Sequence, residues 1–347
     1  MSEREGIISP LAAVGPADAY QGRPQLVYRP GLTRWCLAGG LLLFIVLLWR
    51  IGAEAVGRQL WNAGWALPLV FLPYALTISC ETLAWWFAFP PGRWLRFRDL
   101  LRLTAAAKAV QLLTPSIAQA GEFLKIHLLR VAGVRTDIGT ASVVIAKTTM
   151  TIAELLFIGF GLTFVFGFTA VDPLIATYAW VGIVVMGVGV AGVLLWQRTG
   201  LFRPLRWISR RVGALGAFVD RHEGLLRSTE RFICEHLEEK RRFGLSCLWF
   251  FLGWAFGIVE AWALLAVLGL PSDIPTALAI QAWSAIVTRL TTFIPGNLGA
   301  QEAGIVMIFS YLGLSSESAM AFAVLRRLRQ LAWIAGGLGC LAKTSRT

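Results

Sequence analysis

Two short stretches of this sequence combine helix-breaking residues with a carboxylate in otherwise apolar surroundings. The first, LLTPSIAQAGEFLK, contains Pro115, Gly121 and Glu122, and the second, FIPGNLGAQEAG, contains Pro295 and Glu302. In both stretches the proline precedes the glutamate by seven positions. A helix that begins after such a break directs free N–H groups and the positive end of its dipole into its surroundings. The two stretches therefore predict binding sites for an anionic group.

Further ionisable side chains lie in the apolar segments around the two breaks. At membrane depth each costs about 3 kcal/mol on insertion scales, so it persists where another group pairs with it or uses it. The sequence leaves open whether these charges contact a ligand or form internal salt bridges, whereas for Glu81, Glu154 and Glu260 we expect a structural role. The candidate substrate-binding residues are Thr114, Pro115, Ser116, Gly121, Glu122, Lys125, Lys147, Arg289, Pro295, Asn297, Gln301, Glu302, Arg326 and Arg327.

Motifs for enzymatic chemistry are missing from the sequence. It contains no H-E-x-x-H or D-x-D motif, no glycine-rich nucleotide loop after a strand and no C-x-x-C pair. We therefore expect no metal, no cofactor and no catalytic residues, and predict that the chain is not an enzyme.

The composition identifies the kind of element that carries these residues. Of 347 residues, 56% are hydrophobic and 15% are charged, and the mean hydropathy of +0.66 exceeds that of soluble globular domains. These values predict an integral membrane protein. The net charge of +12 does not indicate a nucleic-acid partner, because the basic residues cluster in the loops on one side of the predicted membrane.

Apolar runs long enough to cross a bilayer occur at 32–49, 65–89, 138–168, 174–196, 244–269 and 317–341. Two more apolar regions, 99–132 and 276–313, are broken near their middles by proline and glycine. Each half is too short to span alone, so each region predicts a re-entrant helical hairpin buried in protein or lining a watery cavity. A pair of kinked full spans is the alternative.

Loop charges favour the hairpins and set the orientation. With both termini in the cytoplasm of a multi-pass inner-membrane protein, the cytosolic segments carry 21 Lys and Arg and the exterior segments carry 2. The predicted segments are a disordered cytosolic tail (1–31), a first transmembrane helix and exterior loop (32–64), a first repeat (65–168), a linking transmembrane helix (169–197), a cytosolic amphipathic segment (198–243), a second repeat (244–341) and a cytosolic tail (342–347).

The two repeats are related by an offset of 180 residues. This offset pairs Pro115 with Pro295, Glu122 with Glu302, Gly133 with Gly313, Asp137 with Glu317, and Lys147 with Arg327. Under the charge-derived orientation, one hairpin opens from the cytosol and the other from outside. The predicted fold is thus an all-α polytopic membrane protein of two inverted repeats, an architecture typical of secondary transporters.

The two break motifs and the basic spans that follow them resemble the lysylphosphatidylglycerol synthase transmembrane-region family, over about residues 32–341. The resemblance implies a flippase-like fold in which the break motifs line the lipid path. We expect a stand-alone member, because no aminoacyltransferase domain follows Thr347. Asn297 stands where the resemblance predicts a second glycine, and Gln301 where it predicts an arginine. These two departures concern headgroup specificity.

The predicted function is transport of a polar lipid, anionic or zwitterionic, between the leaflets. The expected partner is a membrane phospholipid or another polar lipid, with no nucleic acid, and the sequence leaves an oligomer open. A small-solute secondary transporter and a membrane-embedded lipid-modifying enzyme are the alternatives. A lipid path would open laterally to the bilayer, a solute site would be closed and aqueous, and an enzyme would gather catalytic groups at one leaflet.

Overall fold

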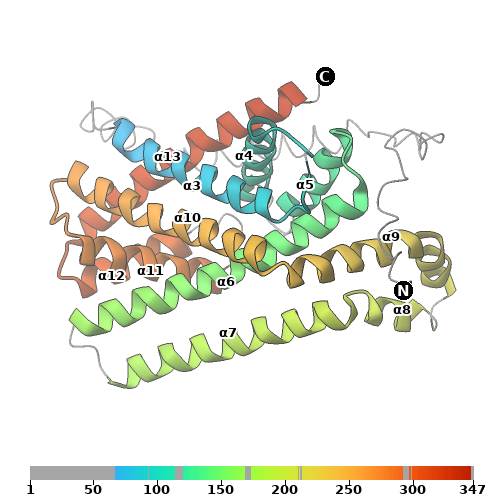
Figure 1. Cartoon of the computed structure of the whole chain (residues 1–347). Helices are drawn as coiled ribbons and strands as arrows, with labels where there is room; N and C mark the ends of the chain where they lie inside the picture. Colours follow the sequence, from blue (N-terminus) through green and yellow to red (C-terminus); the bar gives the residue numbers. More distant parts are fainter. Residues whose placement is uncertain are drawn as a thin grey trace, which may run out of the picture. The chain divides into compact units, whose positions relative to one another are not determined.

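The structure, a computed structural model, describes residues 67–344 except residues 93, 114–119, 169–172, 210, 212, 292–296 and 298. Every regular element in this part of the chain is a helix (Figure 1). The helices are α3 (Leu67–Phe87), α4 (Phe97–Leu113), α5 (Ala120–Val131), α6 (Thr136–Phe168), α7 (Pro173–Gly200), α8 (Arg203–Ser209), α9 (Gly213–Glu238), α10 (Lys240–Val267), α11 (Ile274–Leu290), α12 (Ala300–Tyr311) and α13 (Ser316–Thr344). The all-helical prediction is confirmed for these residues.

Three of the described helices are long and apolar enough to cross a membrane. They contain Thr136–Phe164 in α6, Trp180–Gly200 in α7 and Lys240–Val267 in α10, which coincide with three of the predicted runs. The runs predicted at 65–89 and 317–341 form α3 and α13, and α13 carries three arginines between residues 326 and 329. The predicted tail at 1–31 and the run at 32–49 lie outside the described residues.

Each broken region forms two helices that pack against each other, α4 with α5 and α11 with α12. Helices α4 and α11 both have 17 residues, and α5 and α12 both have 12. Helix α5 begins at Ala120 and α12 at Ala300, and α6 and α13 begin at Thr136 and Ser316. The 180-residue offset read from the sequence therefore also relates the start of α5 to that of α12 and the start of α6 to that of α13.

The same turn follows α5 and α12. Gly133 and Gly313 have φ angles of 85° and 73°, a backbone conformation that glycine adopts without steric cost. The amide that follows each glycine donates to a carbonyl five residues earlier, which closes the helix end. These bonds join Val134 to Leu129 at 2.9 Å and Leu314 to Phe309 at 2.8 Å.

Helices α3 and α10 lie side by side and antiparallel in the middle of the helical assembly (Figure 1). Near the middle of both helices the Thr77 hydroxyl donates to the Gly253 carbonyl at 3.2 Å. Two turns along α3, the Ser246 hydroxyl donates to the Ala84 carbonyl at 2.9 Å. The numbering rises along α3 as it falls along α10, so these two helices run in opposite directions.

Small residues allow two further pairs of helices to approach closely. Helix α4 packs on α13, where a Cβ atom added to Gly337 would lie 2.5 Å from the Ala105 carbonyl oxygen. Helix α11 packs on α6, where a Cβ added to Gly161 would lie 2.6 Å from Cβ of Ala282. Ala105 and Ala282 occupy the same position, the ninth residue, in α4 and α11.

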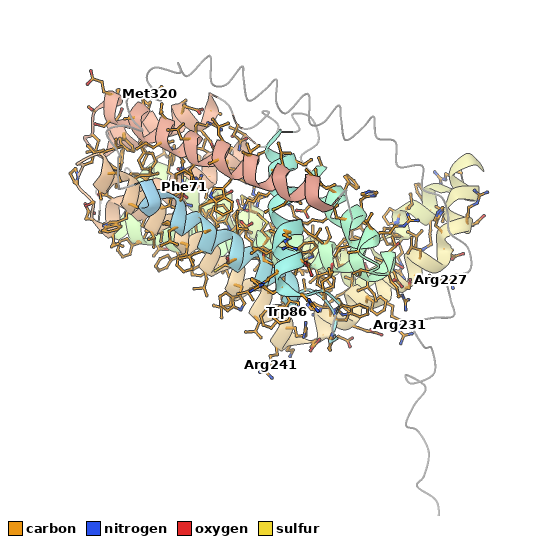
Figure 2. All side chains as sticks on the ribbon, turned by 90° about the horizontal axis from the view of Figure 1, so that it is seen from above. Phe71, Trp86, Arg227, Arg231, Arg241 and Met320 are labelled. Atoms are coloured by element: carbon orange, nitrogen blue, oxygen red, sulfur yellow. The ribbon has the colours of Figure 1, made fainter. Side chains whose placement is uncertain are left out.

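Two labelled arginines lie far from the end of the helical assembly that carries Phe71 and Met320. Figure 2 shows Phe71 of α3 and Met320 of α13 at one end, Arg227 and Arg231 towards the other, and Trp86 and Arg241 between them. Helices α8 and α9 lie together at one end of the helical assembly, within the segment predicted to be cytosolic and amphipathic. Helix α7 packs against α6 and α9, and only 6% of the apolar stretch that could cross a membrane is buried.

Candidate functional site

The first break brings two lysines to one glutamate. Glu122 lies in the first turn of α5, and Lys125 follows it by three residues, so their side chains meet at 3.0 Å. The Lys147 ammonium on α6 lies 3.9 Å from the other carboxylate oxygen, beyond hydrogen-bonding distance. The Lys125 ammonium also lies over the Trp85 ring, 5.0 Å from its centroid. Thr114, Pro115 and Ser116 lie outside the described residues.

Gly121 explains how α5 reaches this position. It is buried, and a Cβ atom there would lie 2.8 Å from the Ala107 carbonyl oxygen of α4. The absent side chain lets the start of α5 rest against the backbone of α4. Glu122 is thereby held near Lys147 of α6, and Lys125 near Trp85 of α3.

At the second break, Glu302 serves two partners. One of its oxygens accepts from the Gly299 amide at 2.8 Å, which caps the start of α12, and the other accepts from Arg327 Nε at 2.6 Å. Arg327 also donates to the Asn297 carbonyl at 3.2 Å. Asn297 and Gly299 have φ angles of 49° and 78°, so the chain turns sharply before α12. Pro295 lies outside the described residues.

Gln301 and Asn297 also bond to α11 and the residue that follows it. The Gln301 amide donates to the Thr288 hydroxyl at 3.0 Å, and the Thr291 hydroxyl donates to the Asn297 side-chain oxygen at 3.4 Å. The two residues that depart from the expected motif thus hold the second break against the end of α11.

The ion pairs of the two breaks repeat at the 180-residue offset. Glu122 on α5 meets Lys147 on α6, and Glu302 on α12 meets Arg327 on α13. The residue 180 positions after Lys125 is Ile305, a buried apolar side chain. The first break therefore carries one more cation than the second.

Two further buried carboxylates bind arginines. Glu260 on α10 is 2.9 Å from Arg329 and 3.7 Å from Arg326, and Arg326 also donates to Gln281 and Ser284. Glu154 on α6 accepts from Arg289 of α11 at 3.1 Å, which links the two predicted repeats. Both glutamate side chains are almost completely buried.

Lys108 is a charged residue that the sequence analysis missed. It pairs with Glu81 of α3 and lies 5.6 Å from the Tyr74 ring centroid, while Arg329 lies 3.9 Å from the same centroid. A lysine between the alanines of α4 is itself a signal, because an isolated cation at membrane depth requires a partner. Among the described core residues, these pairs join seven cations to the five carboxylates Glu81, Glu122, Glu154, Glu260 and Glu302.

No group of His, Cys, Asp and Glu side chains that could hold a metal ion occurs among the described residues. At the two breaks, the ammonium groups of Lys125 and Lys147 and the guanidinium group of Arg327 lie near the starts of α5 and α12, each paired with a first-turn glutamate. Such groups bind phosphate or carboxylate oxygens. The arrangement can hold an anion between helices.

Apolar helices of spanning length around a charged interior define a helical membrane protein. A comparison with known families identifies which kind. The family model described as the lysylphosphatidylglycerol synthase TM region matches residues 36–339, so this chain belongs to that family. This confirms the resemblance carried by the two break motifs. No curated protein and no solved structure matches the chain.

Proposed function

We propose that this chain carries a polar lipid, anionic or zwitterionic, between the two leaflets of the inner membrane without an enzymatic step. The observation that carries the proposal is a pair of helix contacts that correspond when one set of helices is matched with the other. If α3–α6 are matched with α10–α13, the contact of α4 with α13 becomes the contact of α11 with α6. The same matching maps the contact between α3 and α10 onto itself.

This correspondence supports an inverted repeat. Helices α3 and α10, which this matching pairs with each other, run antiparallel, and the matched helices around the breaks have equal lengths. Two halves of opposite orientation give two states of similar energy that open to opposite sides. In this arrangement the broken helices act as re-entrant hairpins, and both termini lie in the cytoplasm.

Exposed apolar residues beside the charges favour a lipid over a small solute. Phe123 follows Glu122 directly and is 65% exposed, and Leu290 follows Arg289 directly and is 67% exposed. A polar headgroup could bind the charges while acyl chains contact these apolar side chains.

A vesicle assay tests the proposal. The full chain is reconstituted with trace phospholipids that carry a fluorescent headgroup or chain, and an impermeant reductant quenches the outer leaflet. We expect vesicles with protein to lose the protected inner-leaflet signal faster than protein-free vesicles. Release of an entrapped soluble headgroup without lipid movement would favour the small-solute transporter. Signal loss equal to that of protein-free vesicles contradicts lipid transport.

A further inference from the structure

We infer that Lys125 and Lys147 together form a binding site for one monoanionic phosphodiester group, the headgroup chemistry of an anionic phospholipid. This inference deepens the proposed function and rests on it for the route by which a lipid reaches the site. It selects one of the two breaks, and it selects anionic over zwitterionic headgroups.

The charges at the first break do not balance. Lys125 is 3.0 Å and Lys147 is 3.9 Å from the single carboxylate of Glu122. Two ammonium groups and one carboxylate leave one positive charge, which a phosphodiester would neutralise. Because an ammonium group has three donors and Lys147 lies beyond hydrogen-bonding distance of Glu122, Lys147 has donors to offer a ligand.

Burial distinguishes this cluster from the other place where two cations share a carboxylate. At Glu260 the side chains of Arg326 and Arg329 are 11% and 5% exposed, and Gln281 and Ser284 accept from Arg326. The side chains of Lys125 and Lys147 are 18% and 30% exposed. A ligand can therefore reach the lysines, whereas the arginines are enclosed by their partners.

The surrounding side chains hold the site in place before a ligand arrives. Trp85 is 1% exposed, donates to the Ser142 hydroxyl at 3.3 Å and supports the Lys125 ammonium over its ring. Gly121 fixes the start of the 12-residue α5 against α4, and the positive end of that helix faces the same region.

The test is lipid binding by the purified full chain, measured by native mass spectrometry with phosphatidylglycerol and phosphatidylcholine at equal concentration. We expect phosphatidylglycerol to bind in preference. Lys125→Gln and Lys147→Gln should each reduce that preference about tenfold, which corresponds to about 1.4 kcal/mol. Lys108→Gln is the matched control, because it removes a lysine from a one-to-one pair with Glu81, and it should keep the wild-type preference.

Two more variants separate a binding role from a folding role. Lys147→Arg keeps the charge and should keep the preference, and Glu122→Gln should bind phosphatidylglycerol at least as tightly as the wild type. An unchanged preference in both lysine-to-glutamine variants overturns the inference, as does weaker binding by Glu122→Gln. Soluble glycerophosphodiester and inorganic phosphate are added as competitors. If the site binds a lipid headgroup, these competitors should displace phosphatidylglycerol only weakly. Displacement of phosphatidylglycerol by an equal concentration of competitor shows that the site takes a free anion instead.

The same variants distinguish failure of the site from failure of the proposed function. If the lysines decide lipid preference but vesicles with protein move no lipid, the site stands and the transport proposal is wrong. If lipid moves and the lysine variants keep the wild-type preference, transport stands and the site is wrong.

Discussion

At the scale of single residues, His236 on α9 is a buried side chain whose protonation links stability to pH. It is 4% exposed, and burial together with the nearby Arg242 lowers its pKa from 6.5 to about 4. The folded protein therefore keeps this imidazole neutral at pH values where an unfolded chain protonates it. Between pH 6.5 and pH 4 the unfolded state binds more protons, so stability falls as the pH falls through this range.

We expect that lowering the pH from 7.5 to 5 reduces the free energy of unfolding by about 2 kcal/mol through His236. Thermal unfolding midpoints at the two pH values, measured in one detergent, provide the test. His236→Leu retains an apolar side chain of similar size without a titrating group, so its midpoint should change less with pH. Equal pH dependence in the wild type and His236→Leu would show that other groups dominate.

At the scale of elements, the close contact between α4 and α13 depends on one glycine. Gly337 is buried with its backbone against Ala105, whereas Gly336, its neighbour, is exposed and has no atom within 4 Å of an added Cβ. Alanine is more favourable than glycine in a helix by about 1 kcal/mol. The two positions therefore separate helix propensity from helix packing.

We expect Gly336→Ala to keep or raise the thermal unfolding midpoint and Gly337→Ala to lower it. The added methyl at residue 337 would meet backbone atoms that cannot rotate away, and overpacking of this kind costs about 1–3 kcal/mol. Gly336→Ala is the control, because it makes the same chemical change one residue away on the same helix. A lower midpoint for Gly336→Ala than for Gly337→Ala would contradict the packing described for α4 and α13.

The helices themselves were accessible from the sequence, but their partners were not. Proline, glycine and the 180-residue offset mark where α5 and α12 begin, because these residues act on the local backbone. The partner of an interior charge depends on which helix faces which, and periodicity does not contain that information. Lys108 was missed for this reason. Arg326 was predicted as a substrate-binding residue, and in the structure its polar partners are Glu260, Gln281 and Ser284.

At the scale of the whole molecule, the proposed inverted repeat predicts on which side of the membrane each loop lies. Ser272 precedes α11, Ser316 begins α13, and Thr199 lies near the end of α7. In the orientation that we propose from the loop charges, the two serines lie outside the cell and the threonine lies inside. If each broken region instead crossed the membrane as one kinked span, the basic segment 198–243 would lie outside.

Single cysteines at these three positions, in a chain whose five native cysteines are replaced, test that statement. We expect an impermeant thiol reagent to label Ser272→Cys and Ser316→Cys in intact cells, and to label Thr199→Cys only after the cells are opened. Labelling of Thr199→Cys in intact cells would contradict the inverted orientation. All three should react in detergent, which controls for buried or unreactive thiols.

The arginines of α13 also have a consequence for biosynthesis. Arg326, Arg327 and Arg329 each cost about 2.5–3.5 kcal/mol at the centre of an inserting helix, so α13 is poorly suited to enter a bilayer alone. Their carboxylate partners lie on α10 and α12, which the ribosome makes first. Helix α13 should therefore integrate as a late partner of helices already at the translocon.

Glycosylation mapping in microsomes should show efficient integration of α13 after α10–α12, and poor integration of α13 alone or after α10–α12 carrying Glu260→Gln and Glu302→Gln. Equal integration in all three cases would mean that α13 needs no earlier helix to cross the membrane.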